Sequence, residues 1–126
     1  MNQVTAKRFC FGITRRQQAR AISKSVRMSP KKVRRVLNQI KGRPYKEAIV
    51  LLKYMPYKAC KPVWKVLYSA VSNAKNNLGL DKQDLFVKIA TVSQGRTYKG
   101  FRSRAQGRIY KILKASCHIH IVVETN

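Results

Sequence analysis

The stretch TVSQGRTYKGFRSRAQGRIYKILK, residues 91–114, decides how this chain folds. It lies in a longer span, between Asp84 and Glu124, that contains no acidic residue. Arginines cluster there around two glycines, between two runs of β-forming residues. The arginines are Arg96, Arg102, Arg104 and Arg108, and the glycines are Gly100 and Gly107. This pattern predicts a long β-hairpin with a cationic tip. Because like charges repel unless a dense polyanion surrounds them, the hairpin indicates a nucleic acid as partner.

The composition indicates one small domain with basic extensions. Of the 126 residues, 28 are Lys or Arg and four are acidic, which gives a net charge of +24. The cysteines Cys10, Cys60 and Cys117 show no CxxC spacing and are typical of a reducing compartment, so no disulfide scaffold is expected. No apolar run approaches the roughly 20 residues of a membrane span, and no secretory signal follows Met1. We therefore expect neither secretion nor contact with a membrane.

Residues 1–19 are interpreted as a basic N-terminal arm. They contain no acid, include Arg15 and Arg16, and show only weak periodicity. Residues 20–126 are expected to form a single domain, with an extended hairpin over about residues 85–123. At the start of this domain, residues 20–28 alternate and predict a short strand, with Ile22, Val26 and Met28 on one side.

Three helices are predicted between this strand and the hairpin. The first covers residues 30–41, because Ser29 suits the N-cap, Pro30 suits the first helical position and Gly42 ends it. Apolar residues recur along it at helical spacing, and cations occupy the other face. The apolar residues are Val33, Val36, Leu37 and Ile40, and the cations are Lys31, Lys32, Arg34, Arg35 and Lys41.

The second helix runs from Pro44 to the stop at Pro56, and the third covers about residues 57–77 before Gly79. Pro62 predicts a kink or a later start in the third helix. The expected buried face of the second helix is Ala48, Leu51, Leu52 and Met55, and that of the third is Cys60, Val63, Leu67, Ala70, Val71 and Ala74.

The two arms of the hairpin are residues 85–97 and 108–123, where β-formers dominate. At about 3.3 Å per residue, such an arm extends about 40 Å. Residues 118–123 are the most apolar part and should lie in the core sheet, while the arginine-rich middle should project. These elements predict an α+β fold, with three helices packed on a small antiparallel sheet and a long protruding β-hairpin.

Aromatic residues among the arginines favour RNA over a merely solvated basic loop. Tyr98, Phe101 and Tyr110 offer rings on which bases can stack, and guanidinium groups bind phosphates through two parallel donors. A DNA-architectural protein is the second hypothesis, but such proteins insert apolar wedges, whereas this tip is rich in arginine. An RNA-processing enzyme is the third hypothesis, and only Asp81 and Asp84 form a pair of carboxylates for it.

Other chemistry has weak support in the sequence. His118 and His120 share one face of a strand, but Cys117 points to the opposite face, and a structural zinc site takes a full tetrahedral set of donors. We therefore favour cross-strand or RNA-facing histidines over metal ligands. Trp64 is expected in the core or at an interface. No cofactor, metal or catalytic residue is predicted, and the chain is not expected to be an enzyme.

Three groups of residues resemble the family of large-subunit ribosomal protein twenty-two, of bacterial and organellar type. The resemblance covers about residues 20–123, and its last group is the most specific. The first group is Lys32-Val33-Arg34 after Ser29, and the second is Ser69-Ala70, Asn73-Ala74 and Asn77. The third is Arg104-Ala105-x-Gly107-Arg108, Ile112-x-Lys114 and His118-Ile119-x-Ile121-Val122.

The resemblance implies a structural constituent of the large ribosomal subunit that binds large-subunit rRNA, supports its assembly and lines the nascent-peptide exit tunnel. It also implies an α+β fold and a single rRNA-binding domain at residues 20–126. The implied partners are large-subunit rRNA, neighbouring large-subunit proteins and the nascent polypeptide, without a homo-oligomer. Residues 54–68 and the arm resemble plastid members, which implies the chloroplast stroma, with the bacterial cytoplasm as the alternative.

The site residues implied by charge and resemblance fall into two sets. The rRNA-binding set is Arg20, Lys24, Arg27, Lys31, Lys32, Arg34, Arg35, Arg96, Arg102, Arg104, Arg108, Lys111, Lys114 and His118. The set expected at the turn of the hairpin, facing the tunnel, is Tyr98, Lys99, Gly100 and Phe101.

Overall fold

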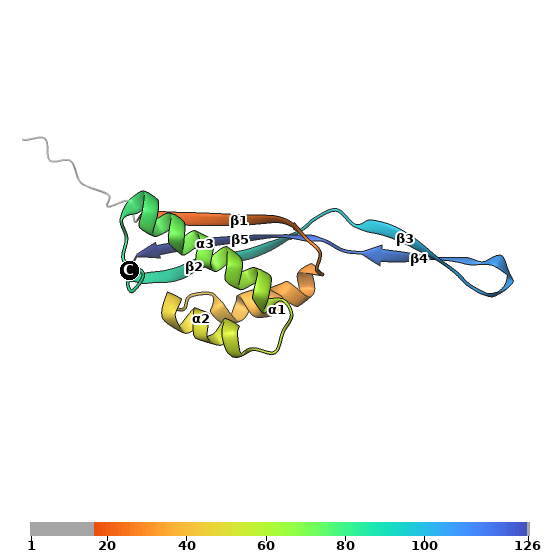
Figure 1. Ribbon diagram of the computed structural model, residues 1–126, viewed down its shortest axis with the longest axis horizontal. Coiled ribbons are helices and arrows are strands. Elements are labelled where there is room, and N and C mark those ends of the chain that lie inside the picture. The colour runs from red at the N-terminus through yellow and green to blue at the C-terminus, as the bar shows by residue number, and fades with distance from the viewer. Residues whose placement is uncertain (1–16, 126) are drawn as a thin grey trace, which may run out of the picture.

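Three helices cover one face of a three-stranded antiparallel sheet, and a separate two-stranded hairpin projects from the end of that sheet (Figure 1). The computed structural model describes residues 17–125. The predicted basic arm therefore lies outside the described residues, except for residues 17–19, of which Gln18 and Ala19 already belong to a strand. The predicted α+β class is confirmed.

The three-stranded sheet has the order β1-β5-β2, so the last strand of the chain lies at its centre. These strands are β1 (Gln18–Val26), β5 (Cys117–Thr125) and β2 (Leu85–Gln94). Alternate residues of β5 face the helices and are fully buried, namely Cys117, Ile119, Ile121 and Val123. The prediction that residues 118–123 lie in the core sheet is confirmed.

The predicted apolar faces of the helices mostly form the core. In α1 (Pro30–Ile40) and α3 (Cys60–Leu78), every residue of the predicted face is buried. In α2 (Tyr45–Tyr54), Ala48 and Leu52 are buried, but Leu51 is only half-buried. The later start of α3 is confirmed, since Pro62 lies in its first turn, where a missing N–H leaves no hydrogen bond unmade. Gly79 ends α3 with a φ of +65°, which favours glycine.

The predicted apolar side of β1 is wrong in its first half. Ala19 and Ala21 face the core, whereas Ile22 is 53% exposed. The reason is that α3 packs across β1, and small side chains let the helix come close. A register shift between Ser23 and Val26, with Ser25 at a φ of +57°, then moves Val26 onto the core side.

The hairpin consists of two ladders rather than two continuous arms. Beyond β2 and β5, the chain forms β3 (Tyr98–Ser103) and β4 (Ile109–Lys114), which pair only with each other. Residues 95–97 and 115–116 form a neck between the ladders. Within the neck, the Gly95 N–H donates to the Ser116 carbonyl at 2.9 Å, and the Ser116 hydroxyl donates to the Arg96 carbonyl at 2.6 Å.

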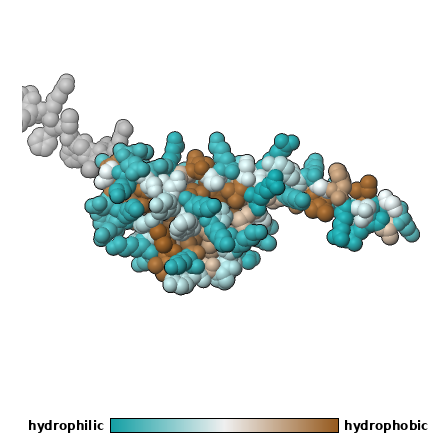
Figure 2. Space-filling model, viewed as in Figure 1, coloured by the Kyte–Doolittle hydropathy of each residue, from teal (hydrophilic) through white to brown (hydrophobic). Residues whose placement is uncertain are grey.

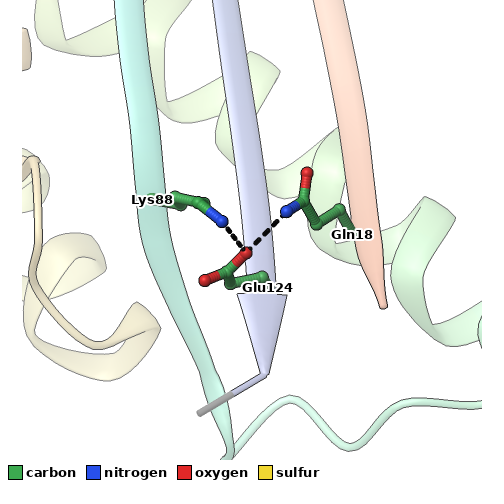
Figure 3. A network of polar contacts seen from close by, with 3 residues as sticks. All are labelled: Gln18, Lys88 and Glu124. Atoms are coloured by element: carbon green, nitrogen blue, oxygen red, sulfur yellow. Dashed lines mark hydrogen bonds and ion pairs between the residues drawn. The ribbon is translucent and has the colours of Figure 1, made fainter. Parts of the chain in front are cut away.

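A buried carboxylate joins the three strands at the end of the sheet away from the hairpin (Figure 3). Glu124 Oε2 on β5 accepts a hydrogen bond from Gln18 Nε2 on β1 at 2.8 Å and lies 2.5 Å from Lys88 Nζ on β2. The side chain of Glu124 is 1% exposed and that of Lys88 37% exposed. This network holds both edge strands to the central strand, where the polypeptide enters and leaves the sheet.

Candidate nucleic-acid interface

The distal ladder of β3 and β4 has no core of its own. Its register runs from Tyr98 opposite Lys114 to Ser103 opposite Ile109, and none of its residues is buried. Phe101, Ile109 and Leu113 are each about two-thirds exposed, at 66%, 67% and 65%. Figure 2 shows hydrophobic and hydrophilic side chains intermixed along this projection. Because an isolated two-stranded hairpin is at best marginally stable in water, this element fits a structure that embeds it in a partner.

The turn of the hairpin lies at residues 104–108. The Arg104 N–H donates to the Arg108 carbonyl at 2.8 Å, and a short 3₁₀ segment, Ala105–Gly107, closes the loop. Gln106 and Gly107 have φ values of +60° and +68°. The Arg104 guanidinium lies over the Tyr110 ring, 5.8 Å from its centroid. The tip is therefore flanked by two exposed arginines, one of which stacks on an aromatic ring.

The predicted place of the turn, at Tyr98 to Gly100, is wrong. These residues and Phe101 belong to β3, and Tyr98 lies at its base, next to the neck. The Arg27 guanidinium of the β1–α1 connection lies 5.6 Å from the centroid of the Tyr98 ring. Both Gly100 and Gly107 suit a turn by composition, but only Gly107 has a positive φ.

The predicted rRNA-binding residues lie in three places. Those of the tip are Arg102, Arg104 and Arg108, those of the body are Arg20, Lys24, Arg27, Lys31, Lys32, Arg34, Arg35 and His118, and those between are Arg96, Lys111 and Lys114. All are exposed except His118. The cations on α1 lie on its outer face, opposite the buried stripe. The ion pairs of the described part of the chain are Arg43–Glu47 and Lys88–Glu124, and neither includes a residue of this set.

The two histidines have separate roles in the structure. His118 is half-buried, and its Nδ1 accepts a hydrogen bond from the Ser25 N–H at 2.9 Å. His120 is also half-buried, and its Nε2 has no hydrogen-bond partner among the described residues. Within residues 17–125, no group of three or more His, Cys, Asp or Glu side chains could hold a metal ion.

The chain's one tryptophan is not in the core. Trp64 lies on the exposed side of α3, and its ring stacks on that of Tyr68 with centroids 5.7 Å apart. The helical stripe could have indicated this, since position 64 follows the buried Val63. Sequence reasoning also missed Lys58, which precedes α3 and faces the base of the hairpin.

No helix in the described residues is long and apolar enough to cross a membrane.

Comparison with known proteins gives one consistent result. The sequence model of the family described as ribosomal protein L22p/L17e matches residues 21–124. A large ribosomal subunit protein uL22 from Synechococcus sp. (strain JA-3-3Ab) is 58% identical over 106 residues, which cover 84% of this chain and 86% of that protein. The uL22 of Acaryochloris marina is 59% identical over 105 residues, 83% of this chain and 88% of its own. A uL22c from Chlorokybus atmophyticus is 52% identical over 107 residues, 85% and 90% of the two chains.

Proposed function

The chain belongs to the ribosomal protein L22p/L17e family, and from this premise we propose that it is a structural constituent of the large ribosomal subunit. In that role it binds large-subunit rRNA, supports assembly of the subunit and lines the nascent-peptide exit tunnel with its hairpin. The family inferred from the sequence motifs is confirmed by the match over residues 21–124.

The structural observation that carries the proposal is the hairpin of residues 98–114, which has no buried residues in its two strands. Its cations are Lys99, Arg102, Arg104, Arg108, Lys111 and Lys114, and its exposed apolar residues include Phe101, Ile109 and Leu113. Folded rRNA supplies phosphates for the cations and unstacked bases for the rings. An environment of this kind satisfies both sets of side chains at once, which water does not.

The residue roles follow from position. Arg102, Arg104 and Arg108 bind rRNA near the tip, and the outer face of α1 binds rRNA beside the body. The turn of Ala105–Gly107 takes the tunnel-facing role that the family resemblance implied for Tyr98, Lys99, Gly100 and Phe101, because it lies at the far end of the hairpin. The nascent polypeptide and neighbouring large-subunit proteins are the further partners. The protein acts as a single copy, without catalysis.

The chloroplast stroma is the proposed location, with the bacterial cytoplasm as the alternative. Support for the chloroplast comes from relatives designated uL22c, the chloroplast form, such as those of Chlorokybus atmophyticus and Mesostigma viride. Cyanobacterial uL22 proteins are 58% and 59% identical to this chain, against 52% and 54% for these two uL22c proteins, which keeps the alternative in place.

A binding titration tests the proposed function. The purified protein is titrated with a large-subunit rRNA transcript, a small-subunit rRNA transcript and duplex DNA, at salt concentrations from about 50 to 200 mM. We expect the tightest binding to the large-subunit transcript, with an affinity that falls by orders of magnitude across this range, because several phosphate contacts each release counterions. Equal affinity for duplex DNA would instead favour the DNA-architectural hypothesis.

A further inference from the structure

A cationic groove of about 720 Å³ lies where the hairpin leaves the body. It is bounded on one side by the β1–α1 connection, the start of α1 and the loop before α3, and on the other by the bases of β3 and β4. The cations that line it are Arg27, Lys32, Lys58, Lys99 and Lys114, and no lining residue is acidic. We call it the neck groove.

The neck groove gathers charge from parts of the molecule that are weakly joined. Arg27, Lys32 and Lys58 belong to the body, whereas Lys99 and Lys114 belong to the hairpin. The two sheets share no ladder, so the short neck carries the connection between them. Across the groove, the contact between the Arg27 guanidinium and the Tyr98 ring is exposed on both sides. Repulsion among five like charges opposes this weak contact and favours an open groove.

We propose that the neck groove binds the phosphate backbone of a single RNA strand, and that this binding fixes the angle between hairpin and body. The inference rests on the proposed function and adds to it a specific site and a conformational consequence. Phosphates that lie between the cations of the body and those of the hairpin attract both groups. They thereby offset the repulsion between the two groups and hold the hairpin to the body. The Tyr98 ring, beside Arg27, provides a surface on which a base of the same strand stacks.

RNA suits the groove better than an acidic protein segment does. Ammonium groups bind phosphate oxygens as point charges, without a fixed geometry, so lysines on two independent elements can share one flexible strand. The rim also offers both a guanidinium and an aromatic ring, the combination that binds unpaired nucleotides. The hairpin would thus take its final direction only when the strand is in place.

Distance measurements between spin labels test the inference. One label is placed at the tip through Gln106→Cys and one on α3 through Asn76→Cys, in a chain with Cys10→Ser; Cys60 and Cys117 are buried and stay unlabelled. The groove variant carries Lys32→Gln, Lys99→Gln and Lys114→Gln. The control variant carries Lys61→Gln, Lys65→Gln and Lys75→Gln, which removes the same charge from exposed positions outside the groove. Circular dichroism checks that both variants fold, and Lys114→Gln alone replaces the groove variant if it does not.

The parent is the labelled chain without the groove or control substitutions. For the parent and the control variant, we expect a broad distribution of the distance between the two labels, which narrows when a short oligouridylate is added at low salt. For the groove variant, the distribution should stay broad at the same RNA concentration. A narrow distribution in the free parent, or equal narrowing in both variants, overturns the inference. Equal narrowing by a polyglutamate peptide of matched charge also overturns it, because the groove would then not select nucleotides.

Titration of the same proteins with the large-subunit rRNA transcript separates the two proposals. A parent that does not bind the transcript overturns the proposed function and this inference together. If the parent binds the transcript but the distribution of distances between its two labels stays broad, only the inference about the neck groove is overturned.

Discussion

The Lys88 ammonium lies 2.5 Å from the carboxylate of Glu124, which is buried in the central strand of the sheet. Because Val123 points into the core under the helices, Glu124 points to the other face, and there it also accepts a hydrogen bond from Gln18. One of the chain's four acidic residues thus joins all three strands, while the cations of the proposed RNA-binding surfaces have no such partner among the described ion pairs.

Removing this carboxylate should destabilise the body. Glu124→Ala takes the acceptor from Gln18 and Lys88, and a lost buried hydrogen bond of this kind costs about 1–3 kcal/mol of unfolding free energy. Glu47→Ala is the control, since Glu47 pairs with Arg43 at the surface, where such a pair contributes less than about 1 kcal/mol. Urea denaturation measures both. Equal losses in the two variants would show that the network at Glu124 does not hold the sheet.

Stability should also fall at alkaline pH because of a buried thiol. Burial raises the pKa of Cys117 in the folded protein. A raised folded pKa gives a contribution to stability that is complete below the unfolded pKa of about 8.5 and is lost as the pH rises above it. Above about pH 8.5, the stability of the wild type should therefore fall more steeply with pH than that of Cys117→Ala. Urea titrations of both proteins at several pH values measure the difference, and parallel pH profiles would contradict it.

Periodicity predicted the helices because α1 and α3 each bury one continuous stripe. It failed for β1, because there the small residues Ala19 and Ala21 face the core and the larger Ile22 does not. In β1 the need for small side chains under α3 decides which residues face the core, rather than the hydrophobicity of each residue. This need comes from the packing of a distant helix, so the local sequence pattern does not show it.

Pairing register, rather than composition, decides where the hairpin turns. Gln94 pairs with Cys117, so the turn must lie midway, near residue 106, and Gly100 falls within a strand. The candidate site was predictable as a set of cations, because exposure follows from charge. The neck groove was not, since it depends on the break between two ladders that the apolar pattern shows as one arm.

The arginines that flank the turn should matter more for assembly than the turn itself. Arg104→Ala with Arg108→Ala removes two charge-assisted contacts, each contributing about 1.5–3 kcal/mol, so affinity for large-subunit rRNA should fall at least about a hundredfold. Lys65→Ala with Lys75→Ala removes the same charge from the body and should have a smaller effect. Quantitative mass spectrometry of purified large subunits measures how much of each tagged variant is incorporated.

A shortened turn completes this comparison. Replacing Ala105–Gly107 with Asn-Gly keeps both arginines and closes the hairpin with a tight two-residue turn. Incorporation should stay at the wild-type level, while the stalling of a tunnel-sensing peptide should change. If the shortened turn abolishes incorporation and the arginine variant assembles normally, the division of roles between arginines and turn is wrong.

Replacing Gly95 by alanine should disturb the neck, whereas replacing Gly100 by alanine should not. A Cβ at Gly95 would lie 2.7 Å from Ser116 Oγ and 3.1 Å from His118 Nε2, whereas a Cβ at Gly100 would meet nothing closer than 3.8 Å. Ser116 Oγ donates to the Arg96 carbonyl within the neck, and His118 Nδ1 accepts from the Ser25 N–H beside it, so Gly95→Ala displaces one bond of the neck and one bond between β5 and β1. Overpacking of this kind costs about 1–3 kcal/mol, whereas Gly100→Ala should be neutral or stabilise β3 by about 0.5–1 kcal/mol. Hydrogen exchange of the Ser25 amide reports on the displaced His118 ring beside the neck: it should speed up in Gly95→Ala and stay unchanged in Gly100→Ala. Equal exchange in the two variants would mean that the contacts at Gly95 do not maintain the neck.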